Sequence, residues 1–297
     1  FSAINAFTLS PALCALFLKP HQKEGEKKMK LGFIGLGNMA KAMIGGILKK
    51  EVVPATDIMG CAKSEASKEY ASGNWGILIG EDNIQVAHFA EILVLAVKPQ
   101  VLPRVVEQIK DAVSEDTVIV SIAAGVSMDS LGRMFGRSLK FVRCMPNTPA
   151  LVGMGCTGVC CNELVTRDEM QQSLSLLQSF GLAEEVPEKL MDAVVGVSGS
   201  SPAYVFLFLE ALADGAVQAG MPRAQAYRFA AQSIMGSAAL ALETGKHPGE
   251  LKDMVCSPGG TTIEAVQVLE DRGFRSSVMH AVSACVERCR ALSKDET

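Results

Sequence analysis

Short apolar runs alternate with helical patterns from Met29 to about residue 150, and this alternation limits the fold more than any other feature. The runs predict strands at residues 30–37, 57–61, 90–99, 116–125 and 140–147. The stretches between them predict helices at residues 38–50, 64–73 (from a Ser cap to a Gly stop), 101–113 and 128–135. Such an alternation is typical of a parallel sheet with right-handed crossovers. The sequence therefore predicts an α/β domain with a doubly wound parallel sheet over residues 29–190.

The pattern changes after about residue 190, where strand signals end. Long helices are predicted at residues 201–220, 222–245, 261–273 and 274–294. These helices are apolar on nearly all sides, and a bundle of about 100 residues cannot bury so much apolar surface alone. We therefore expect residues 191–297 to form an all-α dimerisation domain that also supplies part of the substrate site. The expected assembly is an obligate homodimer, with a ring of dimers as a further arrangement.

The first 28 residues differ from the rest of the chain. Residues 1–18 are almost continuously apolar, near the lower length limit for a membrane span, but they lack the basic start and cleavage site of a secretory signal. The stretch TLSPALCALFLKP resembles part of a transmembrane helix of resistance-nodulation-division efflux transporters. We expect residues 1–28 to be a foreign or disordered leader, with Met29 as the natural start of the fold. The alternative is a membrane anchor.

Composition argues against several classes of partner. The net charge is −4, and Lys and Arg are scattered, so neither nucleic acid nor a membrane surface is an expected partner of the folded part. The nine cysteines lack the paired spacing of a zinc site. We therefore expect no metal, and reduced thiols in a cytoplasmic protein.

The first predicted turn carries a glycine motif. The sequence GFIGLGNMA places Gly35, Gly37 and Ala40 in the pattern G-x-G-x-x-G/A between the first strand and the first helix. In this context the pattern is typical of dinucleotide binding in Rossmann domains. The first glycine allows a tight turn, the second lets the backbone approach a pyrophosphate at the helix N-terminus, and the third small residue allows close packing. The alternative is a tight turn without a ligand.

The end of the second strand bears on the choice of nucleotide. NAD sites usually carry Asp or Glu there, whereas this strand ends in Ala62, Lys63 and Ser64. A cation and a hydroxyl beside a helix N-terminus suit a 2′-phosphate, so we expect NADPH as the preferred cofactor and NADH as the second choice. Alternatively, Lys63 is a solvated surface residue and Ser64 is a helix cap.

Two further groups of residues are expected at this site. The loops 96–100, 121–125 and 145–150 follow predicted strands, where ligands of parallel sheets bind, and their strongly polar side chains are Lys98 and Asn147. The turn in CSPGGTTIEAV (256–266) joins glycines to a helix start. Its backbone amides, with Gly259 and Gly260 at the centre, would bind an anion such as a carboxylate beside the Thr262 hydroxyl. The alternative is a capped glycine turn without a ligand.

These motifs together resemble the pyrroline-5-carboxylate reductase family, which performs the last step of proline biosynthesis. HPGELKDMVCSPGGTTIEAVQVLE (247–270) is similar to the family's signature, and GFIGLGNMAKAMIGG, AVKPQ, SIAAGV, RCMPNTPALV and VVGVSGSSPAYVF match it in the same order. The resemblance covers residues 29–294. It implies that the family's nucleotide contacts fall on Ile34, Gly35, Leu36, Gly37, Asn38, Met39, Ala62, Lys63, Ser64, Asn83, Ala96, Val97, Lys98, Ile122 and Ala124, and its substrate contacts on Glu188, Thr261 and Thr262.

The resemblance also implies a reaction. The family reduces the C=N bond of 1-pyrroline-5-carboxylate to L-proline with NAD(P)H. Because a cyclic imine is basic enough to be protonated near neutral pH, no acidic side chain is needed, and none is evident. The amides at 258–262 would hold the substrate carboxylate, and the Thr262 hydroxyl would bond to the ring nitrogen as the catalytic group. One position departs from the pattern: Met254 stands where some relatives have an Asn that contacts the cofactor.

Two other functions stay open at this point. The first is another Rossmann reductase acting on an imine or a hydroxyacid, although the helix SPAYVFLFLEALADGA lacks the Lys-x-x-Asn pair that would favour a hydroxyacid. The second is a non-enzymatic or membrane-tethered nucleotide-binding module.

Overall fold

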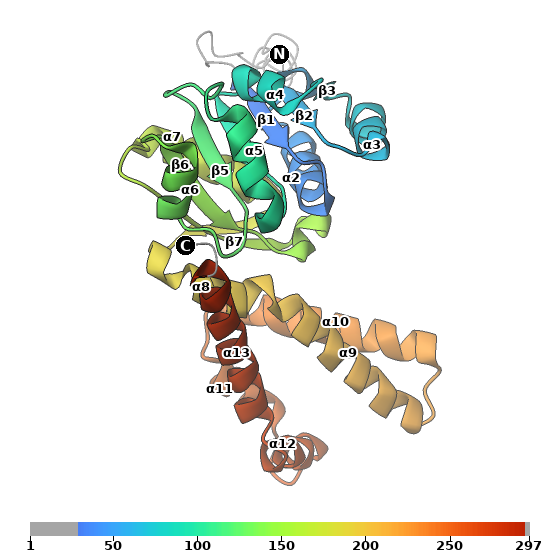
Figure 1. Ribbon diagram of the computed structural model, residues 1–297. Helices are drawn as coiled ribbons and strands as arrows, with labels where there is room; N and C mark the ends of the chain where they lie inside the picture. Colours follow the sequence, from blue (N-terminus) through green and yellow to red (C-terminus); the bar gives the residue numbers. More distant parts are fainter. Residues whose placement is uncertain (1–28, 295–297) are drawn as a thin grey trace, which may run out of the picture.

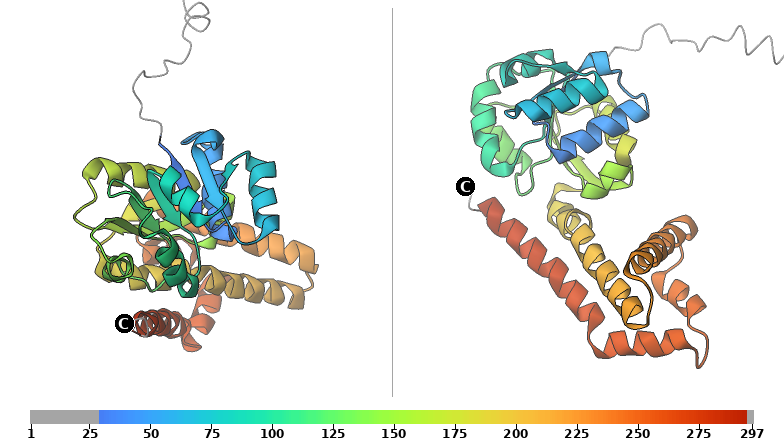
Figure 2. Two further views of the ribbon diagram at one scale, coloured as in Figure 1. Left: turned by 45° about the horizontal axis from the view of Figure 1, so that its top comes forward. Right: turned by 90° about the vertical axis from the view of Figure 1, so that its right-hand side faces the viewer.

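The computed structural model describes residues 29–294, with side chains as far as residue 291. They form an α/β domain that carries a helical region below it (Figures 1 and 2). The leader predicted at residues 1–28, its resemblance to a transporter helix and its alternative as a membrane anchor all lie outside the described residues.

The α/β domain is built on an eight-stranded sheet of order β3-β2-β1-β4-β5-β6-β7-β8. Its strands are β1 (Leu31–Ile34), β2 (Ile58–Cys61), β3 (Leu78–Ile79), β4 (Ile92–Leu95), β5 (Val118–Ser121), β6 (Lys140–Met145), β7 (Gly155–Cys161) and β8 (Gly181–Glu185). The first six strands are mutually parallel, so their carboxyl ends share one edge. This is the nucleotide-binding fold that the alternation predicts.

One part of the sheet departs from the predicted parallel arrangement. β7 runs antiparallel to β6, and β8 is parallel to β7. The connection from β6 to β7 spans residues 146–154. It is shorter than the dozen or more residues that a parallel crossover needs, so the chain can only turn back.

Helices cover both faces of the sheet. They are α2 (Asn38–Lys49), α3 (Glu65–Trp75), α4 (Asn83–Phe89), α5 (Leu102–Ile109), α6 (Met128–Phe135) and α7 (Arg167–Leu177). The predicted stop of the second helix at Gly73 is wrong, because α3 continues to Trp75 and ends at Gly76, whose φ of 64° is left-handed. β3, β7, β8, α4 and α7 were not predicted.

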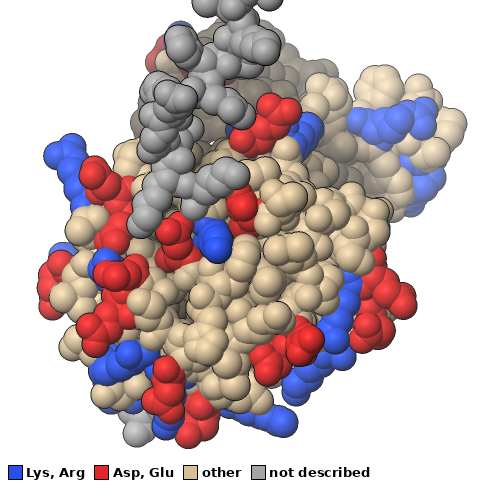
Figure 3. Space-filling model, turned by 90° about the horizontal axis from the view of Figure 1, so that it is seen from above, with Lys and Arg blue, Asp and Glu red and all other residues tan. Residues whose placement is uncertain are grey.

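Two apolar cores lie on opposite faces because successive strand residues point to opposite sides. Leu31 and Phe33 of β1 belong to the core that includes α2 and Phe180, whereas Ile34 belongs to the core that includes α5 and α6. The surface outside these cores carries charges of both signs. Figure 3, a view from above, shows Lys and Arg interspersed with Asp and Glu over this domain.

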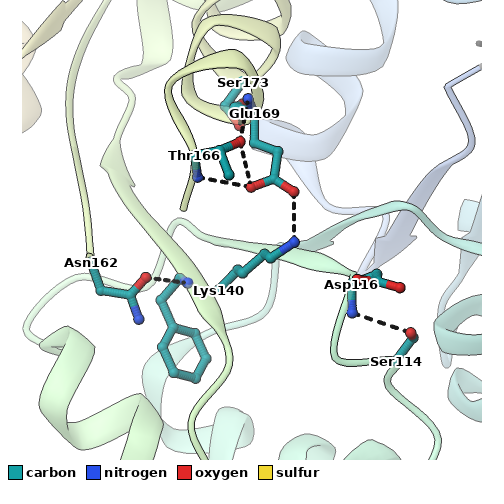
Figure 4. Close-up of polar contacts among 8 residues, drawn as sticks. Ser114, Asp116, Lys140, Asn162, Thr166, Glu169 and Ser173 are labelled. Carbon is teal, nitrogen blue, oxygen red and sulfur yellow. Dashed lines mark hydrogen bonds and ion pairs between the residues drawn. The ribbon is translucent and has the colours of Figure 1, made fainter. Parts of the chain in front are cut away.

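Helix α7 is fixed to the sheet by polar contacts (Figure 4). Thr166 caps the helix and forms a capping box with Glu169, and the same carboxylate pairs with Lys140 of β6 at 2.7 Å. Asn162 accepts a hydrogen bond from the Phe141 amide at 3.1 Å, which joins the end of β7 to the start of β6. These contacts hold the antiparallel end of the sheet together.

The helical region begins with a long run of helix. It contains α8 (Met191–Val194), the π-helical turn η6 (Val195–Gly199), α9 (Ser201–Gln218), α10 (Arg223–Thr244), α11 (Pro248–Val255), α12 (Thr261–Asp271) and α13 (Phe274–Lys294). The four predicted helices correspond to α9, α10, α12 and α13. Helices α9 and α10 pack as a hairpin, and α13 diverges from it (Figure 1).

This region buries little of its apolar surface. Beyond Val195, the buried apolar residues among those described are Ala213, Ala226, Ala230 and Cys289, whereas Phe206, Leu207, Phe229 and Leu242 are exposed. The continuous helix Glu188–Gln218 is long and apolar enough to cross a membrane, by length and composition alone. Between α9 and α13 lies an apolar groove of about 520 Å³, lined by Tyr204, Leu207, Phe208, Leu269, Phe274 and Val278.

Candidate functional site

The turn from β1 to α2 requires glycine at position 35. Gly35 has a φ of 98° and its amide donates to Cys61 O of the neighbouring strand at 2.8 Å. A Cβ there would lie 2.4 Å from Ala96 O. The backbone conformation and the close approach of two neighbouring loops therefore both exclude a side chain.

The next glycine, Gly37, has a different environment. It is the N-cap of α2, with an ordinary φ of −76°, and no side chain caps the helix. A Cβ added at Gly37 would meet nothing within 4 Å. The first turn of α2 therefore presents backbone N–H groups to an open space, which fits a pyrophosphate. Ala40 is buried, as expected of the small residue that lets α2 pack on the sheet.

The end of β2 presents the residues predicted to select the nucleotide. Lys63 and Ser64 are exposed, and Ala62 is half-buried. Ser64 is the N-cap of α3, but its side chain makes no capping bond, which leaves the hydroxyl and the first amides of α3 available. Glu65 in the first turn is paired with Lys68 at 3.3 Å. This helix start therefore suits a phosphate better than a sugar hydroxyl.

The remaining predicted nucleotide residues lie at the same edge. Asn83 begins α4, and its side chain donates to Gln108 Oε1 at 2.8 Å. Beyond β4 and β5, exposed Lys98 and half-buried side chains complete the edge: Ala96, Val97, Ile122 and Ala124. The structure thus brings together the segments after five parallel strands, as a dinucleotide site requires.

Asn147 bonds to backbone groups of its own chain. Its Nδ2 donates to Ser198 O at 2.9 Å, and its Oδ1 accepts from the Cys156 amide at 2.8 Å. The residue is 8% exposed. Because a backbone group bonds to each end of its amide, Asn147 connects the domain to η6, and the cofactor contact predicted for it stays a prediction.

Glu188 also bonds to other residues of its own chain. Its Oε1 accepts from the Met128 amide, at the start of α6, at 2.9 Å and pairs with Arg143 at 3.1 Å. The Arg143 side chain is 8% exposed and the Glu188 side chain is 31% exposed, so the arginine is desolvated while the carboxylate stays partly accessible. This geometry gives Glu188 a structural role, and the substrate contact predicted for it stays a prediction. Sequence reasoning missed Arg143, although an arginine inside the apolar strand KFVRCM is a signal of a buried partner.

The cysteines near this pair are not candidate nucleophiles. Burial, with the nearby Glu188 charge, raises the pKa of Cys160 to about 12, and burial also raises the pKa of Cys144. Both thiols are therefore protonated at neutral pH. The eight cysteines among the described residues form no disulfide, and these residues hold no cluster of three or more His, Cys, Asp or Glu that could hold a metal.

The predicted substrate turn has the expected local geometry. Gly259 has a φ of 66°, and Gly260 donates to Ser257 O at 3.0 Å and is the N-cap of α12. No side chain caps this helix, so its first amides face outward. Thr261 is exposed and Thr262 is half-buried. Such a helix start suits a carboxylate.

This turn, however, lies far from the nucleotide edge of its own chain. α12 packs on α13, and Figures 1 and 2 place it at the end of the helical region furthest from the sheet. The structure therefore brings together the predicted nucleotide residues but does not bring Gly259, Gly260, Thr261 or Thr262 to them. Met254, on α11, is exposed in the same distant part.

Family models match both parts of the chain. Residues 188–292 match the model described as pyrroline-5-carboxylate reductase dimerisation. Residues 30–125 match the model described as NADP oxidoreductase, coenzyme F420-dependent. The comparisons give no support to the transporter resemblance of the leader.

Individual relatives cover nearly the whole chain. Pyrroline-5-carboxylate reductase of Escherichia coli is 51% identical over 265 residues, which is 89% of this chain and 98% of the relative. Among solved structures, a pyrroline-5-carboxylate reductase of Coxiella burnetii superposes with a TM-score of 0.84 at 34% identity, over 90% of this chain and 99% of the other. Plasmodium falciparum pyrroline carboxylate reductase with NADP bound gives 0.82 at 33% identity, over 91% and 100%.

Proposed function

This chain belongs to the pyrroline-5-carboxylate reductase family, and from that premise we propose how its own residues perform the reaction. The enzyme is an NADP-dependent oxidoreductase that reduces 1-pyrroline-5-carboxylate to L-proline. The likeness extends over nearly the full length of reductases of this substrate. A hydroxyacid reductase and a non-enzymatic module are therefore set aside.

The nucleotide is held by the carboxyl edge of the parallel strands. The first turn of α2, opened by Gly37, binds the pyrophosphate, and Lys63 with Ser64 binds a 2′-phosphate. Changing both Lys63 and Ser64 to Ala is then expected to raise KM for NADPH more than KM for NADH. Equal changes for the two cofactors would refute the phosphate assignment.

The substrate is held by the turn before α12. The outward amides at Gly260, Thr261 and Thr262 bind its carboxylate, and the Thr262 hydroxyl bonds to the ring nitrogen. NADPH supplies the hydride that adds to the carbon of the protonated C=N bond. The turn therefore acts by orientation, which can lower a barrier by roughly 7–11 kcal/mol, and the mechanism needs no acidic side chain.

The observation that carries this proposal is the separation of α12 from its own sheet (Figure 1). A turn at the far end of the helical region can serve a nucleotide site only if that site belongs to another subunit. The exposed apolar helices and the groove between α9 and α13 provide the surface for such a pairing. We therefore place each active site between the nucleotide domain of one chain and α12 of its partner.

Mixing two defective variants tests this arrangement. Gly37→Asp adds a negative charge at the pyrophosphate position, where the protein leaves open space, and Thr262→Val removes the hydroxyl. Gly37→Asp alone should be nearly inactive, and Thr262→Val alone should keep about a tenth to a hundredth of the wild-type kcat/KM. After joint unfolding and refolding in equal amounts, about a quarter of the sites in randomly paired dimers combine two intact halves. Recovery of activity is therefore expected; no recovery from well-folded mixed dimers would contradict the shared site.

The proposal also includes expectations about the compartment of the enzyme and about truncation at Met29. The lack of disulfides among the described cysteines suits a cytoplasmic enzyme. Because the proposed nucleotide and substrate residues all fall within residues 29–294, an enzyme truncated to begin at Met29 should retain full reductase activity, as measured by NADPH oxidation.

A further inference from the structure

Asn147 joins the nucleotide domain to the first turns of the helical region. It follows β6 at the carboxyl edge of the sheet, and its Nδ2 reaches Ser198 O while its Oδ1 accepts from the Cys156 amide. Burial of a side-chain amide is tolerated when its donor and acceptor are both satisfied. Here both partners are backbone groups, so the side chain acts as a rigid link between two parts of the chain.

The acceptor of this link lies in an unusual turn. Ser198 belongs to η6, where the Ser200 amide bonds to Val195 O at 2.8 Å, five residues back. A π turn inserts one residue into a helix and shifts its bonding pattern, and such turns frequently occur at functional sites. The Asn147 side chain therefore fixes the position at which the long helix α9 leaves the domain.

Close packing on both sides of η6 couples its position to that of β6 and α13. A Cβ at Gly199 would lie 3.0 Å from Met145 Cε, at the end of β6. A Cβ at Gly196 would lie 3.1 and 3.2 Å from side-chain atoms of Val282 and Val286 on α13. The turn is thus wedged between the nucleotide edge and α13, and a shift of η6 would move α9 and α13 relative to that edge.

We infer that Asn147 is a positioning residue for hydride transfer. It fixes the helical region against the nucleotide edge, so that the partner's substrate turn holds the imine at the correct place over the nicotinamide. This inference rests on the proposed function, because it takes the substrate turn to come from the partner. It does not depend on the direct cofactor contact predicted from the sequence.

The substitution Asn147→Asp tests the link selectively. Aspartate keeps the size and the acceptor for the Cys156 amide, but its ionised carboxylate would face Ser198 O without a proton to donate. We expect kcat to fall about ten- to a hundredfold near pH 8, since a small misplacement can cost about a hundredfold. The dissociation constant of NADPH should stay within about twofold.

Lowering the pH should rescue this variant. A protonated aspartic acid can again donate to Ser198 O, and a buried carboxyl facing a carbonyl favours its neutral form. The ratio of the variant's kcat to that of the wild type should therefore rise between about pH 8 and about pH 6. With NADPH deuterated at the transferred position, the isotope effect on kcat should exceed the wild-type value at high pH, because misalignment slows the chemical step itself.

Asn162 provides a matched control. Its Oδ1 accepts from the Phe141 amide at 3.1 Å and its Nδ2 donates to Leu139 O at 2.8 Å, so it makes the same pair of bonds as Asn147. Its partners, however, belong to the nucleotide domain at the start of β6, whereas Asn147 follows the end of that strand. Asn162→Asp should lower the stability to a similar extent but leave kcat and its pH profile close to those of the wild type.

Three results would overturn the inference. They are a wild-type kcat in Asn147→Asp, an equal loss of kcat in both Asp variants, and a loss of NADPH affinity large enough to explain the lower activity. If Asn147→Asp does not fold at high pH, Asn147→Ala and Asn162→Ala give the same comparison without a charge. A wild-type enzyme inactive on pyrroline-5-carboxylate would instead contradict the proposed function.

Discussion

Two glycines two residues apart have different physical roles. Gly35 is required by its left-handed backbone and by the carbonyl of Ala96 beside it. Gly37 has an ordinary backbone conformation and empty space around it, so the fold itself does not require a glycine there. The motif therefore combines one residue needed for folding with one residue needed for the ligand.

Alanine substitutions should separate these roles. Gly35→Ala should lower the free energy of unfolding by about 2–4 kcal/mol, because the methyl group is strained and collides with the neighbouring loop. Gly37→Ala should change it by less than about 0.5 kcal/mol but raise KM for NADPH roughly tenfold, since the methyl group lies where the pyrophosphate approaches. Urea unfolding and steady-state kinetics measure both quantities. Normal stability in Gly35→Ala would contradict the backbone argument.

Thr262 and Thr261 offer a second matched pair. Thr262→Val keeps the shape of the side chain and should leave NADPH affinity unchanged, because the nucleotide lies on the other domain. Its kcat/KM for pyrroline-5-carboxylate should fall about ten- to a hundredfold, the effect of one hydrogen bond to a charged group worth about 1.5–3 kcal/mol. Thr261→Val should cost less if its backbone amide is the group that binds. Wild-type kinetics in Thr262→Val would mean that this hydroxyl has only a structural role.

At the scale of elements, the sequence predicted what local patterns determine. The strands β1, β2, β4, β5 and β6 and the helices between most of them follow from apolar runs and turns. β3 was missed because two residues carry no periodicity, and β7 because GCTGVCC does not resemble a strand. The reversal at β7 could have been inferred from the short connection before it.

The candidate site shows the same division. The residues that follow parallel strands could be grouped from the sequence, since the topology brings their ends together. The hydrogen bond of Asn147 to Ser198 and the ion pair of Glu188 with Arg143 could not be predicted from the sequence. The partners lie 51 and 45 residues away along the chain and are brought near by tertiary packing. The distance of α12 from the sheet depends on how the helices are arranged, which no local pattern encodes.

The capping box of α7 should make the stability of the protein depend on pH. Burial opposes ionisation of Glu169, but hydrogen bonds from Lys140 and Thr166 outweigh it and lower the pKa of this carboxyl below its usual 4.5. The resulting stabilisation is present above that value and is lost as the pH falls through the lower folded-state pKa. Glu169→Gln should therefore lower the free energy of unfolding by roughly 1 kcal/mol near neutral pH.

Acid should abolish this difference. Once the pH falls below the lowered pKa of the folded state, the wild-type carboxyl is protonated as well, so the unfolding free energies of wild type and Glu169→Gln should converge. Chemical denaturation at several pH values measures the effect, and Glu163→Gln, at an exposed position nearby, serves as the control. A difference that persists unchanged in acid would mean that the charge of Glu169 is irrelevant.

The described part of the molecule consists of a domain with two apolar cores and a helical region that buries few of its apolar residues. The buried apolar residues of the nucleotide domain form two clusters, whereas the helical region exposes Leu207, Phe229 and Leu242 among others. The family model that matches this region is one of dimerisation. Apolar surface of this extent is normally covered by a partner.

A charge in the apolar groove should therefore separate binding from catalysis. Leu207→Asp, on α9, is expected to give a monomer whose nucleotide domain still binds NADPH but whose reductase activity is lost. Sedimentation and NADPH fluorescence measure the two properties. Leu164→Asp, at a 42% exposed position of the nucleotide domain, should change neither. An active monomeric Leu207→Asp enzyme would refute the requirement for a partner.

Because the two parts of the chain differ in how much apolar surface they bury, they should fold one after the other during synthesis. Domains fold as units, and the N-terminal part of a chain leaves the ribosome first. Both cores of the nucleotide domain are complete once Ala183 has emerged, so this domain can fold while the helices are still being made. The apolar sides of the helices then stay exposed until a second chain binds to them. The final folding step is thus an encounter between two chains, and its rate should depend on how many nascent copies are made close together.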